Sequence, residues 1–166
     1  MMRRLMLAVV AVAGFTLADA AIAQNDQTIV ERAVGSGQFQ TLVGALKETG
    51  LDITLNEPGS FTVFAPTDAA FAAIPREERL RLLNPENREE LRRLLLFHVL
   101  PEEVGLDQIE GRAVIATTAM GEPLGIDGTA TPVNIGGAPY VGTTVDASNG
   151  IIHVVDEVIL PPELAR

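Results

Sequence analysis

The chain has two parts with different local patterns, and this division constrains its fold more than any other feature. In most of residues 28–97, apolar side chains recur at helical spacing. Four of them fall on one face of a predicted helix over Gln38–Thr49: Phe39, Leu42, Val43 and Leu46. From residue 111 onward, short runs rich in Val, Ile and Thr alternate with Gly, Pro and Asn, which is typical of strands joined by close turns. A helical part followed by a strand-rich part predicts an α+β fold.

Local signals place the ends of the predicted elements. Further helices are expected at 28–34, 68–73, 76–83 and 84–97, with a strand at 61–65. Thr28 is a candidate N-cap of the first helix, and Thr67 or Asp68 of the helix 68–73, because their oxygens accept free N–H groups of a first turn. Later strands are predicted at 112–117, 123–126, 131–135, 140–145 and 151–155. Asn149-Gly150 predicts a type I′ hairpin turn, since both residue types tolerate positive φ.

Composition bounds the class of protein. The 166 residues suffice for one ordinary domain, and 47% hydrophobic residues supply a core. A net charge of −10 disfavours binding to nucleic acid or to anionic lipid, and 4% aromatic residues disfavour a base-stacking surface. The absence of Cys excludes disulfides, thiolate metal sites and Cys nucleophiles.

The N-terminus has the pattern of an export signal. Arg3 and Arg4 precede an apolar run from Leu5 to Ala18, and Ala21-Ile22-Ala23 fits the small-x-small rule for cleavage. The run is shorter than the roughly 20 residues that span a bilayer. We therefore expect a signal peptide over 1–23, cleaved after Ala23, and no transmembrane span in the mature chain; the alternative is an uncleaved N-terminal anchor. A short polar lead (24–27), a single domain (28–162) and a C-terminal tail (163–166) would follow, in the periplasm or outside the cell.

Catalytic signals are nearly absent. Neither a G-x-S-x-G elbow nor a P-loop occurs, and His98 and His153 are the only two His residues. His153 and Asp156 would point to opposite faces of a strand, so they do not form a metal-ligand pair. His98 lies on the apolar side of a predicted helix end, which indicates a buried imidazole bonded to a carbonyl or to Asp68. We expect no catalytic residue, no cofactor and no metal; a hydrolase using His98 or His153 is the weakest hypothesis.

Three ordered segments resemble the fasciclin-like (FAS1) domain family. Thr62–Phe71 matches the first family box, T-V-F-A-P-T-x-x-A-F, throughout. Asn149–Asp156, followed by Val158–Pro161, resembles the second box, and Leu95–Leu100 resembles the central segment with its helix-end His. The motif residues are Thr62, Phe64, Ala65, Pro66, Thr67, Asp68, Phe71, His98, Asn149, Gly150, His153 and Asp156.

The resemblance implies the FAS1 fold, in which a helical layer packs on a seven-stranded, two-sheet β-wedge. It also implies a secreted or periplasmic binding module without catalytic activity, whose partner is a cell-surface protein, a matrix protein or a polysaccharide. The alternative is a carrier of a hydrophobic pigment or lipid in a crevice between helices and sheet. Box residues suit architecture, so the candidate partner surface is the adjacent stretch: Thr143, Thr144, Val145, Asp146 and Ala147.

The chain also departs from the family pattern. Thr144 stands where animal adhesion domains carry an Asp before the second box, and Phe97 stands where many relatives have Tyr. An Arg-Gly-Asp sequence is absent. Integrin-type recognition is therefore not carried over to this chain.

Overall fold

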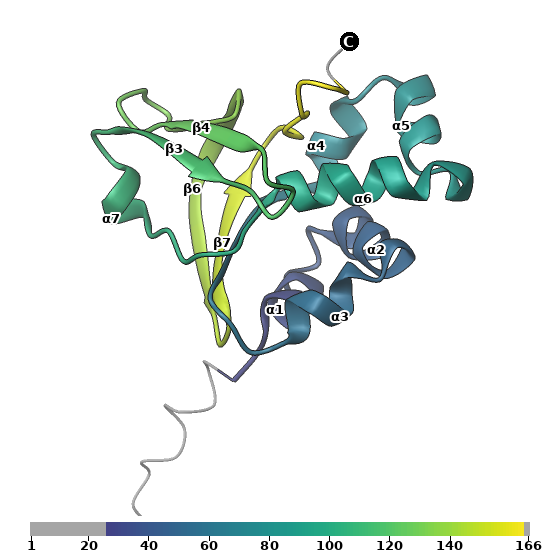
Figure 1. The fold of residues 1–166 in the computed structure, drawn as a ribbon, viewed down its shortest axis with the longest axis horizontal. Coiled ribbons are helices and arrows are strands. Elements are labelled where there is room, and N and C mark those ends of the chain that lie inside the picture. The colour runs from purple at the N-terminus through teal and green to yellow at the C-terminus, as the bar shows by residue number, and fades with distance from the viewer. Residues whose placement is uncertain (1–25, 165–166) are drawn as a thin grey trace, which may run out of the picture.

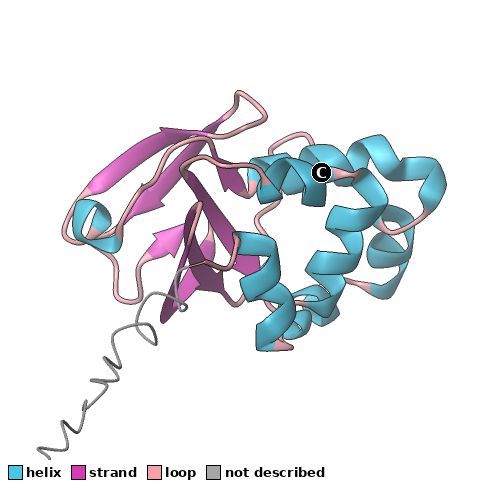
Figure 2. Ribbon diagram, turned by 90° about the horizontal axis from the view of Figure 1, so that it is seen from below, coloured by secondary structure: helices cyan, strands magenta, loops and turns pink. Residues whose placement is uncertain are grey.

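The computed structural model describes residues 26–164, which form a helical layer beside a strongly curved sheet (Figure 1). The predicted signal peptide, with its cleavage site after Ala23, lies outside the described residues, as do the first residues of the lead and the last two of the tail. Figure 2 separates the two parts, with most helices on one side and the strands on the other.

The helical layer consists of short helices with well-defined ends. Thr28 caps the first helix through a capping box with Glu31, and Gly37 and Gly50 end the first two helices with φ near +70°, which favours glycine. Their bounds are α1 Ile29–Ser36, α2 Gln40–Thr49, α3 Leu51–Asn56, α4 Asp68–Ala73, α5 Arg76–Leu82 and α6 Arg88–Phe97. A 3₁₀ turn, Pro85–Asn87, precedes α6.

The described strands form one seven-stranded sheet with the order β2-β1-β7-β6-β5-β4-β3. Their bounds are β1 Phe61–Pro66, β2 Val99–Leu100, β3 Ala113–Thr117, β4 Pro123–Asp127, β5 Asn134–Ile135, β6 Ala138–Ala147 and β7 Gly150–Val155. The neighbours pair antiparallel except β1 and β7, which pair in parallel although they lie about ninety residues apart in sequence.

Strand β6 divides the sheet into two halves. Its first residues pair with β5 and its later residues with β7, and the register shifts between Tyr140 and Thr144. Gly142 lies inside this irregularity with a φ of +84°, a conformation that suits glycine. The strand therefore bends there and turns the two halves toward each other, so the predicted two-sheet wedge is confirmed.

Two apolar clusters fill the molecule. One joins the helices to the first half-sheet and includes Leu42, Leu94 and Ile152. The other lies between the half-sheets and includes Phe64, Ile126 and Ile135. The sheet therefore buries both of its faces around β1 and β7: Ala65 on the helix side and Phe64 on the other side are completely inaccessible to solvent.

Several predicted elements differ from the structure. Helix α3, strand β2 and the short helix α7 (Leu106–Ile109) were not predicted, because each is too short to show a periodicity. The predicted helix 84–97 is divided into a 3₁₀ turn and α6, and the predicted strand 131–135 forms only at Asn134–Ile135. The type I′ turn is wrong: among the described residues no non-glycine has positive φ, so Asn149 does not take the required conformation.

Candidate functional site

The first family box lies where β1 enters α4. Phe64, Ala65 and Pro66 are buried in β1, and Phe71 of α4 is buried in the helix-side cluster. Thr62 is also buried; its hydroxyl donates to the Glu102 carbonyl at 2.7 Å and accepts from the Val104 N–H at 2.8 Å. Thr62 therefore ties the segment after β2 to β1.

The two candidate caps of this box serve different helices. The Thr67 hydroxyl accepts from the Ala70 N–H at 3.2 Å and so caps α4. The Asp68 carboxylate reaches α2 instead, accepting from the Thr41 N–H at 2.7 Å and the Gln40 N–H at 3.3 Å. Desolvation raises the pKa of Asp68, but these hydrogen bonds from Thr41 and Gln40 outweigh it and hold the pKa below its ordinary value.

Replacing Asp68 with alanine is expected to lower the free energy of unfolding by about 1–2 kcal/mol, because α2 loses its N-terminal acceptors. Asp68→Asn keeps an acceptor oxygen and should lose less than half as much. Urea unfolding of the three proteins at pH 7 measures both values. An alanine variant as stable as the wild type would show that the carboxylate does not support α2.

His98 ends α6 inside the core. Its Nδ1 donates to the Leu94 carbonyl at 2.7 Å, and its Nε2 accepts from the Ile159 N–H at 3.0 Å. Complete burial lowers the pKa of His98 to about 4, although the bond to Leu94 opposes this shift. The predicted carbonyl partner is present, and Asp68 is not a partner. Both ring nitrogens are occupied, so no ring nitrogen is left to act as a general base.

His153 links the core to the candidate partner surface. Its Nε2 donates to the Val104 carbonyl at 2.8 Å, which leaves Nδ1 to accept from the Thr144 hydroxyl at 3.1 Å. The Tyr140 hydroxyl in turn donates to the Thr144 oxygen at 2.7 Å. Burial lowers the pKa of His153, against the opposing effects of the Val104 carbonyl and Asp146. The chain of hydrogen bonds therefore holds a neutral imidazole beneath the bend of β6.

In the second family box, Asn149 connects the start of α1 to the end of α3. The buried Asn149 side chain accepts from the Ile29 N–H at 2.9 Å and donates to the carbonyls of Leu55 at 2.6 Å and Glu57 at 3.0 Å. A Cβ on Gly150 would collide with the Phe61 carbonyl, so only glycine fits there. Asp156 is exposed beyond the end of β7. Within residues 26–164, no group of three or more His, Asp or Glu side chains is arranged to hold a metal ion.

The candidate partner surface is the second half of β6. Thr143, Thr144 and Asp146 are exposed, whereas Val145 and Ala147 are half-buried against the helix-side cluster. This half of β6 pairs with β7 on one side, while β5 pairs only with Ala138 and Pro139. These five residues therefore form a short strip with a strand neighbour on one side.

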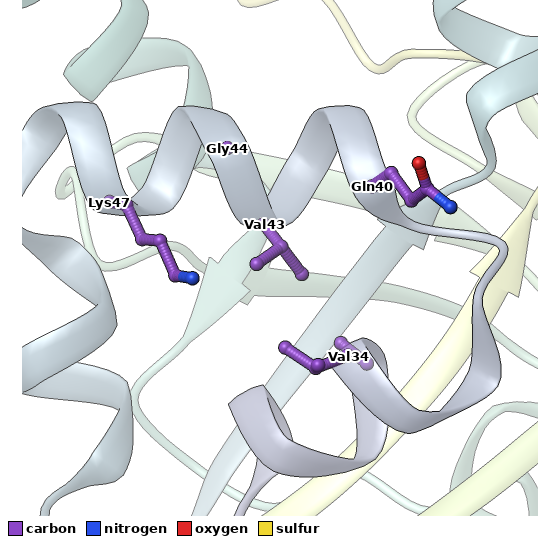
Figure 3. Close-up of a pocket in the computed structure, with 6 residues that line it drawn as sticks. Val34, Gln40, Val43, Gly44 and Lys47 are labelled. Atoms are coloured by element: carbon purple, nitrogen blue, oxygen red, sulfur yellow. The ribbon is translucent and has the colours of Figure 1, made fainter.

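The hollows of the described surface are shallow; two of them, of about 420 Å³ over β3 and β4 and about 390 Å³ on α5, are broad and open to solvent. A shallow groove of about 250 Å³ lies between α1 and α2, where Val34 and Val43 face each other between Gln40 and Lys47 (Figure 3). The apolar hollow between helices and sheet, lined by residues such as Leu55, Leu96 and Val99, measures about 50 Å³. Pockets for small organic ligands are typically about 300–1,000 Å³. The crevice expected for a pigment or lipid carrier is therefore closed by side chains in this structure.

Sequence reasoning missed two residues that position the site. Tyr140 lies in β6 four residues before Thr144, a separation that brings the two hydroxyls together only because the strand bends between them. Val104 lies outside any regular element, so nothing marks its carbonyl as the partner of His153. Among the described residues, no helix is long and apolar enough to cross a bilayer.

Comparisons with known proteins agree with this geometry. The model of the fasciclin domain matches residues 37–161. Protein sll1483 of Synechocystis sp. is 42% identical over 86% of this chain and 78% of its own length. Transforming growth factor-beta-induced protein ig-h3 of Sus scrofa is 34% identical over 81% of this chain, which spans only 19% of that protein. A solved FAS1 domain pair from the insect cell adhesion molecule fasciclin I superposes with a TM-score of 0.74 at 17% identity, covering 86% of this chain and 53% of the other.

Proposed function

The chain belongs to the fasciclin domain family, and from that premise we propose that it is an exported, non-catalytic module that binds a cell-surface or matrix component. The observation that carries the proposal is the match to fasciclin domains over most of the chain, one of which comes from a protein described as a cell adhesion molecule. The export signal predicted at residues 1–23 supports a location outside the cytoplasm. Mass spectrometry of the protein from periplasmic and culture fractions should find a chain that begins at Gln24.

The chemistry of the two imidazoles favours binding over catalysis. His98 has both ring nitrogens engaged, and the Nδ1 of His153 accepts a hydrogen bond from Thr144. A hydrolase that used His98 or His153 would need that imidazole to accept a proton from a nucleophile at the surface, and burial lowers both pKa values. We assign both rings to the support of the fold.

We place the partner contact on the strip Thr143–Ala147. Its exposed groups are the Thr143 hydroxyl, the Asp146 carboxylate and the backbone along the side of β6 that has no strand neighbour. The buried His153 holds the Thr144 hydroxyl in place through a hydrogen bond. A fixed, polar and weakly acidic strip suits a protein segment or a neutral polysaccharide. Anionic glycans are disfavoured, because the chain carries a net charge of −10.

The test is a binding screen of the chain from Gln24 to Arg166 against matrix proteins, neutral glycans, anionic glycans and lipid vesicles. For the partner found, Asp146→Arg is expected to weaken binding at least tenfold, because it reverses the only charge in the strip. Glu77→Arg on α5 makes the same charge change on an exposed helix and should leave binding within twofold. Equal losses in both variants would show that net charge, rather than this strip, governs binding. Binding to no component of the screen would count against the function itself.

A further inference from the structure

Strand β3 ends the sheet with an edge that is free over Ala113–Thr117; just beyond it, the Ala119 N–H donates to the Val99 carbonyl of β2 at 2.7 Å. Strand β3 occupies the last position in the strand order and pairs only with β4. Figure 1 shows β3 and β4 together at the side of the molecule away from α1, α2 and α3. A free edge is a template for pairing with another strand, because its N–H and C=O groups remain available.

The register with β4 identifies which backbone groups face outward. The Thr118 N–H donates to the Glu122 carbonyl, and the Arg112 carbonyl accepts from the Gly128 N–H. In an antiparallel ladder the bonded residues alternate, so Val114 and Ala116 bond to β4 between these two positions. The N–H and C=O groups of Ala113, Ile115 and Thr117 therefore point away from β4, and no hydrogen bond to any of them is found within the described residues.

Strand β3 lacks the devices that usually protect an edge. Its sequence, Ala-Val-Ile-Ala-Thr, contains no charged residue and no proline. Ile115 is 78% exposed, the highest value among the large apolar side chains of the described surface. It faces Gly125 across the ladder, so no side chain of β4 covers it at that position. An apolar side chain and a row of free backbone groups thus coincide on one strand.

We propose that β3 pairs with β3 of a second copy of this chain, antiparallel and centred on Ile115. Because the free groups recur on alternate residues, Ile115 faces its own equivalent across a two-fold axis, and Ala113 faces Thr117. Each facing pair exchanges both N–H···O bonds. The two Ile115 side chains, now neighbours on one face of a continuous sheet, shield each other from water.

The charges beside the strand favour a second copy over an unrelated segment. Arg112 is the only Lys or Arg between positions 99 and 164. In the centred register it lies opposite Thr118 of the other copy, and Thr118 pairs in turn with Glu122. Arg112 and Glu122 of the two copies therefore lie in one row across the extended sheet, two strand spacings or about 10 Å apart, and the two-fold axis repeats this arrangement of opposite charges. A shift of the register by two residues loses both the central Ile115 pair and this complementarity.

The pairing buries little more than one strand edge, so the dimer is weak and depends on concentration. Sedimentation velocity of the chain from Gln24 to Arg166, from about 10 µM to 1 mM, is expected to show a sedimentation coefficient that rises toward the dimer value. Ile115→Lys should abolish the rise, because two like charges would face each other at the axis. Ile53→Lys is the matched control: Ile53 is 68% exposed on α3, and the rise should be unchanged.

A second measurement covers the case in which Ile115→Lys does not fold. Because the chain has no Cys, an Ile115→Cys variant carries one nitroxide label. At high concentration, labels at 115 should give a short inter-label distance that vanishes on dilution, and labels at Ile53→Cys should not. A chain that remains monomeric up to 1 mM overturns the proposal. A dimer that persists in Ile115→Lys, or labels at 115 that stay far apart, places any interface elsewhere and overturns it equally.

Discussion

Replacing Asn149 with alanine is expected to lower the free energy of unfolding by about 4 kcal/mol. The side chain accepts from the Ile29 N–H and donates to the carbonyls of Leu55 and Glu57, and it is only 3% exposed. A buried polar group that loses its partner costs about 1–3 kcal/mol, and alanine can replace none of the three bonds. One substitution therefore detaches α1 and the end of α3 from the turn before β7.

The same substitution at Asn134 serves as the control. Asn134 makes a single side-chain hydrogen bond, to the Gly137 N–H at 2.8 Å in an exposed turn. Asn134→Ala should therefore cost no more than about 1 kcal/mol, since water can replace the lost acceptor. Chemical denaturation followed by circular dichroism measures both variants. If the two variants lost equal stability, the buried hydrogen bonds of Asn149 to α1 and α3 would not stabilise the fold as inferred.

Acidification from pH 7 to about pH 4 is expected to remove about 3 kcal/mol of stability through His98 alone. Burial lowers its folded-state pKa to about 4, from an ordinary value of 6.5. The unfolded chain therefore takes up the proton first, so the stabilisation is complete above pH 6.5 and is lost as the pH falls toward 4. Each unit of pKa difference corresponds to 1.36 kcal/mol. The lowered pKa of His153 acts in the same direction.

A His98→Gln variant isolates this effect. The amide can still donate and accept hydrogen bonds, but it does not titrate. Between pH 5 and 6, the stability of the wild type should rise with pH more steeply than that of the variant, by about 1.2 kcal/mol per pH unit. Urea unfolding at a series of pH values gives both slopes. Parallel slopes would mean that His98 titrates normally in the folded chain, contrary to its burial.

The sequence was sufficient to predict the fold class but not the contacts that hold it together. The helical spacing of Leu42 and Leu46 reflects one buried face of α2, so periodicity alone identified that helix. Strand β2 has only two residues and exists because it pairs with β1 at Val63 and Thr62. No local pattern marks such a strand, since its cause lies in another part of the chain.

The candidate site shows the same limit at single residues. Asp68 precedes a helix and looks like its cap, yet its carboxylate caps α2, twenty-seven residues earlier in the chain. Asn149-Gly150 was predicted as a type I′ hairpin turn, and Asn149 does lie in the short loop between β6 and β7, without the type I′ conformation. Its side chain is buried and bonds to α1 and α3. In both cases the residue type correctly indicated a hydrogen-bonding role. The partner, however, lies far away in the sequence and is determined by the tertiary packing.

The parallel pairing of β1 with β7 has a consequence for the order in which the molecule is made. Strand β1 leaves the ribosome long before β7, and its partners from Phe61↔Gly150 to Pro66↔Val155 come from almost the last residues of the domain. Contacts so distant in sequence make folding slow, because a long loop must close before they form. A nascent chain without its final strand lacks the strand that joins β1 to β6, so its sheet cannot be completed until synthesis is nearly finished. Under the export proposed above, this delay would keep the chain unfolded until it reaches the membrane.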